Sequence, residues 1–168
     1  NWNFQNTYTN LPSIYYSKVK PHNFDNPKLI LFNEELANEL NLKVNYNEKE
    51  ICDFLLGKGL DNNKFYSQAY AGHQFGHFTI LGDGRALLLG EHINKNNKRF
   101  DIQLKGSGKT PYSRNGDGKA ALGPMIREYL VSEAMHYLNI STTRALAIII
   151  TGEKILREKY EPGAVLVR

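Results

Sequence analysis

A glycine-rich segment in the middle of the chain, DIQLKGSGKTPYSR from Asp101 to Arg114, restricts the possible folds more than any other feature. Its GSGKT letters resemble a Walker phosphate loop, which requires an earlier glycine, four intervening residues and a helix that begins at Lys-Thr. Gln103 occupies the position of that earlier glycine, and the residues after Pro111 have turn chemistry without a helical period. A Rossmann turn fails as well, because Pro111 or Leu87 would have to be its third glycine. The segment therefore predicts a glycine loop of another kind.

Apolar runs and turn residues predict an α+β fold with an antiparallel sheet and one main helix. The runs RALLLGEHI and RFDIQLKG flank the Asn-rich turn NKNNK, which is typical of a β-hairpin. A glycine-dense loop follows from Gly106 to Gly123, and Pro124 then suits the first turn of the helix PMIREYLVSEAMHYL, which should end near Asn139. The runs TTRALAIIITGE and GAVLVR are typical of buried strands.

The first 64 residues differ in composition and periodicity from the rest. Residues 1–27 are rich in Asn, Tyr and Pro and have no sustained period, which predicts an irregular arm packed by its aromatic residues. LILF predicts a short strand, and Asn33 can cap the helix EELANELNL after it. A second short helix, EKEICDFLL, should end at Gly57. We therefore expect an arm with short helices over residues 1–64 and a sheet-rich lobe over residues 65–168.

Composition narrows the class of protein. A chain of 168 residues with 41% hydrophobic and 23% charged residues is typical of one folded domain. It has no apolar run near the roughly 20 residues that cross a bilayer and no secretory signal, so we expect a cytoplasmic protein without a membrane partner. Basic residues are scattered except around residues 98–119, which argues against nucleic acid and favours a polyphosphate-sized anion. The single cysteine, Cys52, is expected on a buried helix face.

The order of the motifs matches the small lobe of a protein kinase. A glycine loop at Gly82–Gly84 precedes two strands, the second strand ends in Lys105, and the helix that follows carries Glu128 and Glu133. In that arrangement the lysine binds phosphate oxygens and a helix glutamate holds the lysine. Taken singly, Lys105 is better explained as a solvated strand-end residue and Glu128 as a surface charge. Order and spacing together favour the functional interpretation.

Six motifs, YAGHQFG, LGDGRALLLGE, LKGSGKTPYSRNGDGKA, IREYLVSEAMHYL, TTRAL and EPGAVLVR, resemble the selenoprotein O family of kinase-like protein adenylyltransferases. The resemblance covers essentially the whole chain. It implies a protein-kinase-like fold that binds ATP in a flipped orientation with Mg²⁺ or Mn²⁺. It also implies transfer of AMP to Ser, Thr or Tyr hydroxyls of protein substrates.

Carried over motif by motif, the resemblance also assigns roles to single residues. It makes Lys105 the phosphate-binding lysine, Glu128 its partner and Arg168 the first of two phosphate-binding arginines. The further nucleotide contacts that it implies are Gly82, Gly84, Arg85, Asp117 and Gly118. The second arginine, the catalytic aspartate and the metal ligands would lie beyond residue 168. We therefore expect this segment to hold no metal ligands and to be inactive alone.

Alternative interpretations accompany these assignments. The chain could be a nucleotide-sensing pseudokinase module without turnover, or part of a conventional phosphotransferase. Asp117 in NGDG is as well explained by an Asx turn as by metal binding. Tyr66, Tyr70 and Phe75 are interpreted as core residues, and Ser113 as a turn hydroxyl.

Overall fold

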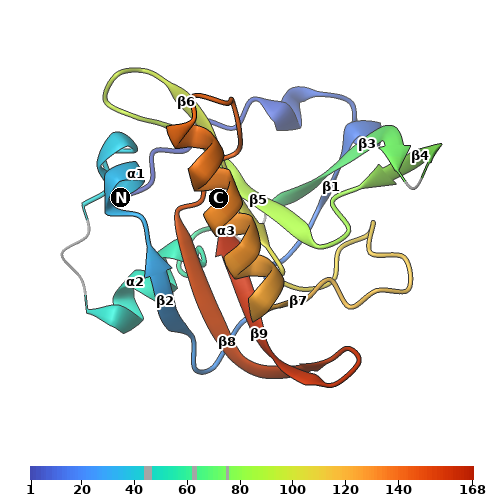
Figure 1. The fold of residues 1–168 in the computed structure, drawn as a ribbon. Coiled ribbons are helices and arrows are strands. Elements are labelled where there is room, and N and C mark those ends of the chain that lie inside the picture. Colours follow the sequence, from blue (N-terminus) through green and yellow to red (C-terminus); the bar gives the residue numbers. More distant parts are fainter. Residues whose placement is uncertain (44–46, 62–63, 75) are drawn as a thin grey trace.

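One antiparallel sheet organises the molecule (Figure 1). The computed structural model describes residues 1–43, 47–61, 64–74 and 76–168. In these ranges the strand order is β1-β3-β5-β6-β9-β8-β2, with β4 paired to β3 and β7 paired to β9. The strands are β1 (Tyr16–Lys18), β2 (Lys28–Phe32), β3 (Tyr66–Gln74), β4 (His77–Gly82), β5 (Ala86–Ile93), β6 (Arg99–Lys105), β7 (Ala120–Ala121), β8 (Ala147–Leu156) and β9 (Tyr160–Val167). The helices are α1 (Glu34–Glu39), α2 (Glu48–Leu55) and α3 (Leu122–Tyr137), with 3-10 turns at Tyr8–Asn10 and Ser13–Tyr15.

The central hairpin β5–β6 confirms the sequence prediction. Its register runs from Ala86 opposite Lys105 to Ile93 opposite Arg99. Asn94 closes the turn, because its side-chain oxygen accepts hydrogen bonds from the amides of Asn96 and Lys98, each at 3.0 Å. Asparagine suits such turns because its short side chain bonds nearby backbone groups.

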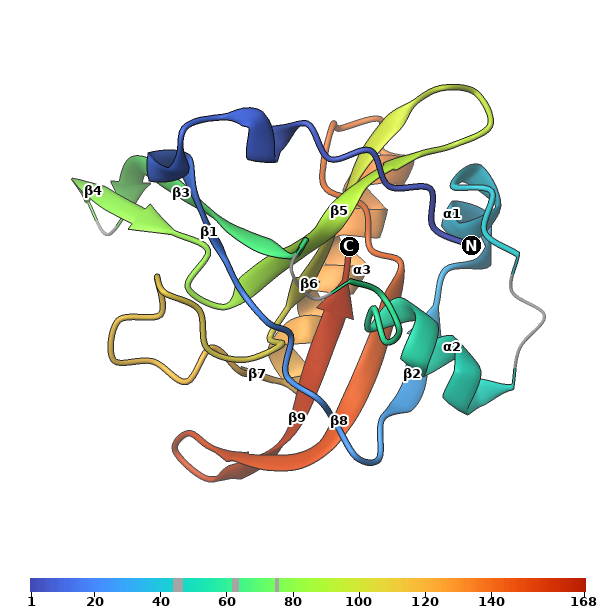
Figure 2. The same ribbon diagram turned by 180° about the vertical axis from the view of Figure 1, so that it is seen from behind.

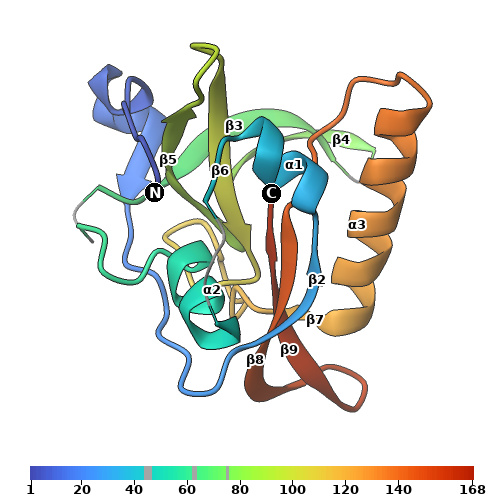
Figure 3. The same ribbon diagram turned by 90° about the vertical axis from the view of Figure 1, so that its left-hand side faces the viewer.

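Residues 147–151 of β8 and 163–167 of β9 are almost entirely buried on both faces, which explains the continuous apolar sequence of these halves. Along β9, Val165 and Val167 face a core shared with α1 and α2, whereas Ala164 and Leu166 face a second core beneath α3. On β8, Ile148 likewise joins the α3 side. Figure 3 shows this layering, with α3 on one side of the two strands and α2 on the other.

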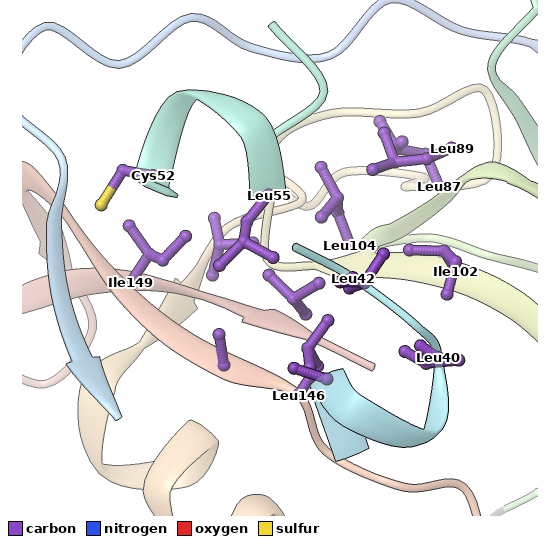
Figure 4. Packing of buried hydrophobic residues seen from close by; sticks show 14 of the residues in the cluster. Leu40, Leu42, Cys52, Leu55, Leu87, Leu89, Ile102, Leu104, Leu146 and Ile149 are labelled. Atoms are coloured by element: carbon purple, nitrogen blue, oxygen red, sulfur yellow. The ribbon is translucent and has the colours of Figure 1, made fainter. Parts of the chain in front are cut away.

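The larger core packs the two short helices against the sheet. Figure 4 shows Cys52 of α2 beside Ile149 of β8, and Leu55 of α2 between Ile149 and Leu104 of β6. Cys52 has no exposed surface, as the sequence predicted, and burial raises the pKa of its thiol to about 11. Its side chain therefore serves as a small apolar group.

Helix α3 begins slightly earlier than the sequence predicted. Gly123 lies in its first turn and not in the preceding loop, because β7 pairs with β9 and leads the chain directly into the helix. The helix ends at Tyr137, close to the predicted Asn139, which has a left-handed φ of 59°.

The hairpin β3–β4 was missed by the sequence analysis. It projects from the rest of the sheet (Figure 1), and its outer part is exposed on both faces, with Phe78 and Ile80 open to solvent. A strand without a buried face needs no alternation of apolar and polar residues, so the usual sequence signal is absent.

The N-terminal residues belong to the same sheet as the rest of the chain. Strands β1 and β2 form its two ends, and the arm crosses β5 (Figure 2), where the Gln5 amide donates to the Glu91 carbonyl at 2.9 Å. Trp2 stacks on Phe54 of α2 with ring centroids 4.8 Å apart. The arm is thus ordered by its aromatic residues, whereas a domain boundary between residues 64 and 65 stays a prediction.

The α+β class and the antiparallel sheet are confirmed. Among the described residues, no helix combines the length and apolar character needed to span a bilayer.

A buried carboxylate ties α3 to the sheet and to α1. Glu133 is only 8% exposed, and it accepts hydrogen bonds from the Arg144 guanidinium at 2.8–3.1 Å, from the Ala145 amide at 2.9 Å and from the Asn33 side chain at 2.7 Å. Asn33 also caps α1, since its side-chain oxygen accepts from the Leu36 amide. Burial alone would raise the pKa of Glu133, but these bonds outweigh burial and hold that pKa below 4.5.

Glu133→Gln should destabilise the fold. The change keeps the side-chain shape but leaves Arg144 without its main partner, so we expect the free energy of unfolding at pH 7 to fall by about 3 kcal/mol. Urea denaturation of the purified protein measures this loss. Glu158→Gln, at an exposed position after β8, is the matched control and should stay within about 0.5 kcal/mol of the wild type.

The same pair should make stability depend on pH. Because the pKa of Glu133 is lowered on folding, its charged form stabilises the fold above about pH 4.5 and loses this effect as the pH falls through the folded-state pKa. The difference between the wild type and Glu133→Gln should therefore shrink below pH 4.5. An undiminished difference at lower pH would contradict this assignment.

Candidate functional site

A cleft of about 580 Å³ opens between the turn after β4, the loop before β7 and the ends of β6 and β9. Its walls include every nucleotide contact named in the sequence analysis, namely Gly82, Gly84, Arg85, Lys105, Asp117, Gly118 and Arg168. Glu128 lines an adjoining hollow of about 310 Å³ along α3, where Lys105 and Arg168 also form part of the wall. The structure thus brings together residues from widely separated parts of the chain.

Lys105 and Glu128 meet at the junction of β6 and α3. On β6, Ile102 and Leu104 point into the larger core, so the side chain of Lys105 lies on the opposite face, toward α3. Its ammonium is 2.6 Å from Oε2 of Glu128. Both side chains are about a quarter exposed, so the pair can still reach a ligand in the cleft.

Arg168 completes a three-residue ion network. Its guanidinium donates to the second oxygen of Glu128 at 2.6 Å and, through Nε, to the side chain of Gln103 at 2.7 Å. The backbones of Gln103 and Arg168 also exchange two hydrogen bonds, at 2.7 and 2.9 Å. Gln103, which broke the Walker pattern, therefore orients a cation at the cleft.

The glycine turn is fixed by Thr110 at the end of GSGKT and by Ser113 just after it. The hydroxyl of Thr110 donates to the carbonyl of Asp83 at 2.6 Å, and the hydroxyl of Ser113 donates to the carbonyl of Gly84 at 2.5 Å. Both hydroxyl-bearing residues are buried, so Thr110 holds a neighbouring loop where a Walker threonine would hold a metal ion. The two glycine-rich loops therefore form one hydrogen-bonded unit.

Close packing explains two of the glycines. A Cβ on Gly82 would overlap the Tyr112 ring and lie 2.7 Å from the Gln68 carbonyl oxygen, and one on Gly84 would lie 2.9 Å from the Tyr112 carbonyl oxygen. Tyr112 is itself held by Ser17 of β1, whose hydroxyl is 3.0 Å from its own. The turn therefore lies directly on the loop below it.

Asp83, between the two glycines, was not singled out by the sequence analysis. It is buried at the cleft wall, and its carboxylate accepts from the Gln68 amide at 3.0 Å. Burial raises the pKa of Asp83 above 3.8. An aspartate between glycines usually indicates a turn, so the sequence carried no signal of this burial.

Asp117 and Gly118 form the opposite wall. The Lys119 amide donates to Asp117 Oδ1 at 2.9 Å, as in an Asx turn, and both carboxylate oxygens also bind Arg157. The hydrogen bond from Arg157 is the main reason why the pKa of Asp117 lies below 3.8. Of the two interpretations of Asp117, these contacts favour the turn.

Positive charge distinguishes the cleft. Two carboxylates, Asp83 and Asp117, share its walls with five cationic side chains: Arg85, Lys105, Arg114, Lys119 and Arg168. Another hollow, of about 570 Å³ under the N-terminal arm, has almost the same volume, but its walls carry fewer charged side chains, namely Lys18, Asp61 and Lys64. Size does not separate the two hollows, whereas charge makes the cleft suited to a polyanion.

Of the two tyrosines predicted to be core residues, one is buried and the other is exposed. Tyr66 is fully buried, as expected, and stacks on Tyr8. Tyr70 was wrongly predicted to be a core residue: it is 51% exposed and lines the cleft, because β3 has left the core at that point. Phe75 lies outside the described residues.

No metal-binding cluster is found in the described ranges, in which no group of three His, Cys, Asp or Glu side chains could hold an ion. The cleft by itself therefore offers cations and backbone groups to an anionic ligand, not a set of metal ligands.

Comparisons with known proteins agree on one family. A family model described as Protein adenylyltransferase SelO matches residues 1–168. Protein nucleotidyltransferase YdiU of Clostridium perfringens (strain SM101 / Type A) is 58% identical over 99% of this chain and 34% of its own length. The proteins of the same name from Brevibacillus brevis and Pelagibacter ubique are 57% and 52% identical, over 99% of this chain and 34% and 35% of their lengths. The chain spans about a third of the length of these relatives.

Gly82→Ala should disturb the turn by steric overlap. Since the added methyl group collides with the Tyr112 ring, we expect a loss of about 2 kcal/mol in the free energy of unfolding, measured by urea denaturation. Gly72→Ala is the matched control, because a Cβ there meets no atom within 4 Å, and it should change stability by less than about 1 kcal/mol. Equal losses in the two variants would contradict the close packing.

Proposed function

This chain belongs to the protein adenylyltransferase SelO family, and we propose that it forms the ATP-binding part of an enzyme that transfers AMP from ATP to hydroxyl side chains of proteins. The proposal concerns the activity of the longer protein, because the chain spans only about a third of its curated relatives.

The observation that carries this proposal is the meeting of Lys105, Glu128 and Arg168 at a cationic cleft. A triphosphate carries several negative charges, and the cleft offers it lysine and arginine side chains of different character. Arg85 and Arg168 suit orientation, because a guanidinium can bind two phosphate oxygens at once. Lys105 acts as a mobile point charge whose partner Glu128 limits its position.

The chemistry of AMP transfer suits such a cleft. A substrate hydroxyl gives its proton to a base and attacks the α-phosphorus, and a new P–O bond forms. The bond between the α-phosphorus and the oxygen that bridges to the β-phosphorus breaks, and pyrophosphate leaves with that oxygen. Negative charge then accumulates on the leaving group, and cations held in place before the reaction stabilise it. In this proposal, ATP lies reversed relative to a kinase, so that Lys105 and Arg168 face the departing phosphates.

We further propose that the sheet and α3 form a protein-kinase-like small lobe. The order of glycine turn, strand pair, lysine and helix glutamate supports this, as does the Lys105–Glu128 ion pair. In the proposal the catalytic base and the ligands for Mg²⁺ or Mn²⁺ come from outside the described residues. The segment alone would then bind ATP weakly and would not catalyse transfer.

The position of the label in ATP tests the reaction. Full-length protein incubated with ATP labelled at the α-phosphate should transfer label to protein, whereas ATP labelled at the γ-phosphate should not. Label from the γ position alone would overturn the proposal in favour of a conventional phosphotransferase. ATP binding without label from either position would favour a nucleotide-sensing module.

Lys105→Ala tests the cleft. Removal of the ammonium should reduce transfer from α-labelled ATP at least about 100-fold, as expected for a group that stabilises transition-state charge. Lys98→Ala removes an equal charge from the exposed turn before β6 and should leave transfer within about twofold of the wild type. Wild-type rates in Lys105→Ala would remove Lys105 from the proposed site.

A further inference from the structure

We infer that Arg157, in the turn between β8 and β9, is a positioning residue for the Asp117–Lys119 turn of the cleft. This inference rests on the proposed function, since it assumes that the cleft receives ATP. Arg157 does not line the cleft and acts on a ligand only through the residues that it holds.

The guanidinium of Arg157 binds the turn at both ends. Its two terminal nitrogens donate to the two carboxylate oxygens of Asp117, at 2.8 and 3.0 Å. One of them also donates to the carbonyl oxygen of Lys119 at 3.1 Å. A planar guanidinium with two parallel bonds fixes direction as well as distance, which a lysine cannot do.

A second ion pair joins the same hairpin to the same turn. The ammonium of Lys119 is 2.9 Å from Glu153 of β8, and the other oxygen of Glu153 is 3.2 Å from Nε2 of His22. In Figures 1 and 2 the β8–β9 hairpin extends beneath the loop that leads into β7. Both charged residues of the turn are therefore held from the hairpin.

The turn has little freedom to adopt another path. Gly118 has a φ of 69°, and a Cβ there would overlap the backbone of Gly108, so the turn lies directly on the start of the glycine loop. Arg157 approaches the turn through Asp117 on its exposed side. Packing therefore fixes the Gly118 part of the turn, and Arg157 holds the Asp117 part.

Charge gives Arg157 its second effect on the cleft. Asp117 is one of two carboxylates in the wall, and an unpaired carboxylate would repel a triphosphate. Paired with Arg157, its charge is largely cancelled. Loss of Arg157 should therefore weaken ATP binding by releasing Asp117 and by leaving its negative charge unpaired.

If the Arg157–Asp117 ion pair only stabilised the fold, its loss would lower the melting temperature. The side chains of Arg157 and Asp117 are 37% and 46% exposed, and exposed pairs contribute little to global stability. We therefore expect Arg157→Ala to leave the melting temperature nearly unchanged while ATP affinity falls.

Calorimetric titration of the full-length protein with ATP tests the inference. Arg157→Ala should weaken ATP binding about tenfold, and Arg157→Lys, which restores charge but not two parallel bonds, should recover part of the loss. Lys159→Ala removes the same charge from the same turn and should bind ATP like the wild type. If Arg157 acts through Asp117, Arg157→Ala should have less than about a twofold effect in an Asp117→Asn background.

The titrations test the role of Arg157 separately from the proposed ATP-binding function. Unchanged affinity in Arg157→Ala, with wild-type binding intact, overturns the role of Arg157 but leaves the proposed function standing. An equal tenfold loss in the Asp117→Asn background also overturns it, because Arg157 would then act by another route. No ATP binding by the wild type overturns the proposed function and this inference with it.

Discussion

The carboxylate of Glu128 between Lys105 and Arg168 is the interaction on which the site depends. Lys105 ends β6 and Arg168 follows β9, and the antiparallel register places Arg168 opposite Gln103, so that both cations lie on the same face of the sheet. Two partly buried cations at close range repel each other, and Glu128 offsets this repulsion by binding each through a different oxygen. Because Glu128 lies on α3, the position of that helix determines whether the cations can serve one ligand.

A second constraint is the mutual support of the loops around the cleft. Buried hydroxyls of Thr110 and Ser113 bind the glycine turn, and the β8–β9 hairpin holds the far end of the same long loop. Gly82 and Gly84 do not have a left-handed φ, so backbone conformation does not require glycine at these positions. Glycine is needed there because Tyr112 lies too close to leave room for a Cβ. The cleft is therefore built from loops held in one arrangement before any ligand binds, which reduces the ordering that binding would require.

The sequence predicted most of the regular structure and only part of the site. The longer strands with a buried face and the helices with caps were identified, because burial and capping leave a local pattern, whereas the short strands β1 and β7 were missed. The projecting β3–β4 hairpin was missed because its residues do not show such a pattern. For the same reason the exposure of Tyr70 was not predicted. Asp83, Gln103 and Arg157 were not assigned to the site. Each acts through a partner more than 14 residues away in the chain, which local sequence does not reveal.

By itself, the sequence determined which face of β6 carries Lys105, because side chains alternate along a strand and Ile102 and Leu104 must face the core. It likewise excluded a Walker loop, because a missing glycine cannot be replaced by packing. Only the tertiary structure decided that Thr110 would bind the glycine turn, that Gln103 would orient Arg168 and that Arg157 would hold Asp117. Hydrogen bonds of this kind form between residues brought together by sheet register and helix packing, and these depend on the whole chain.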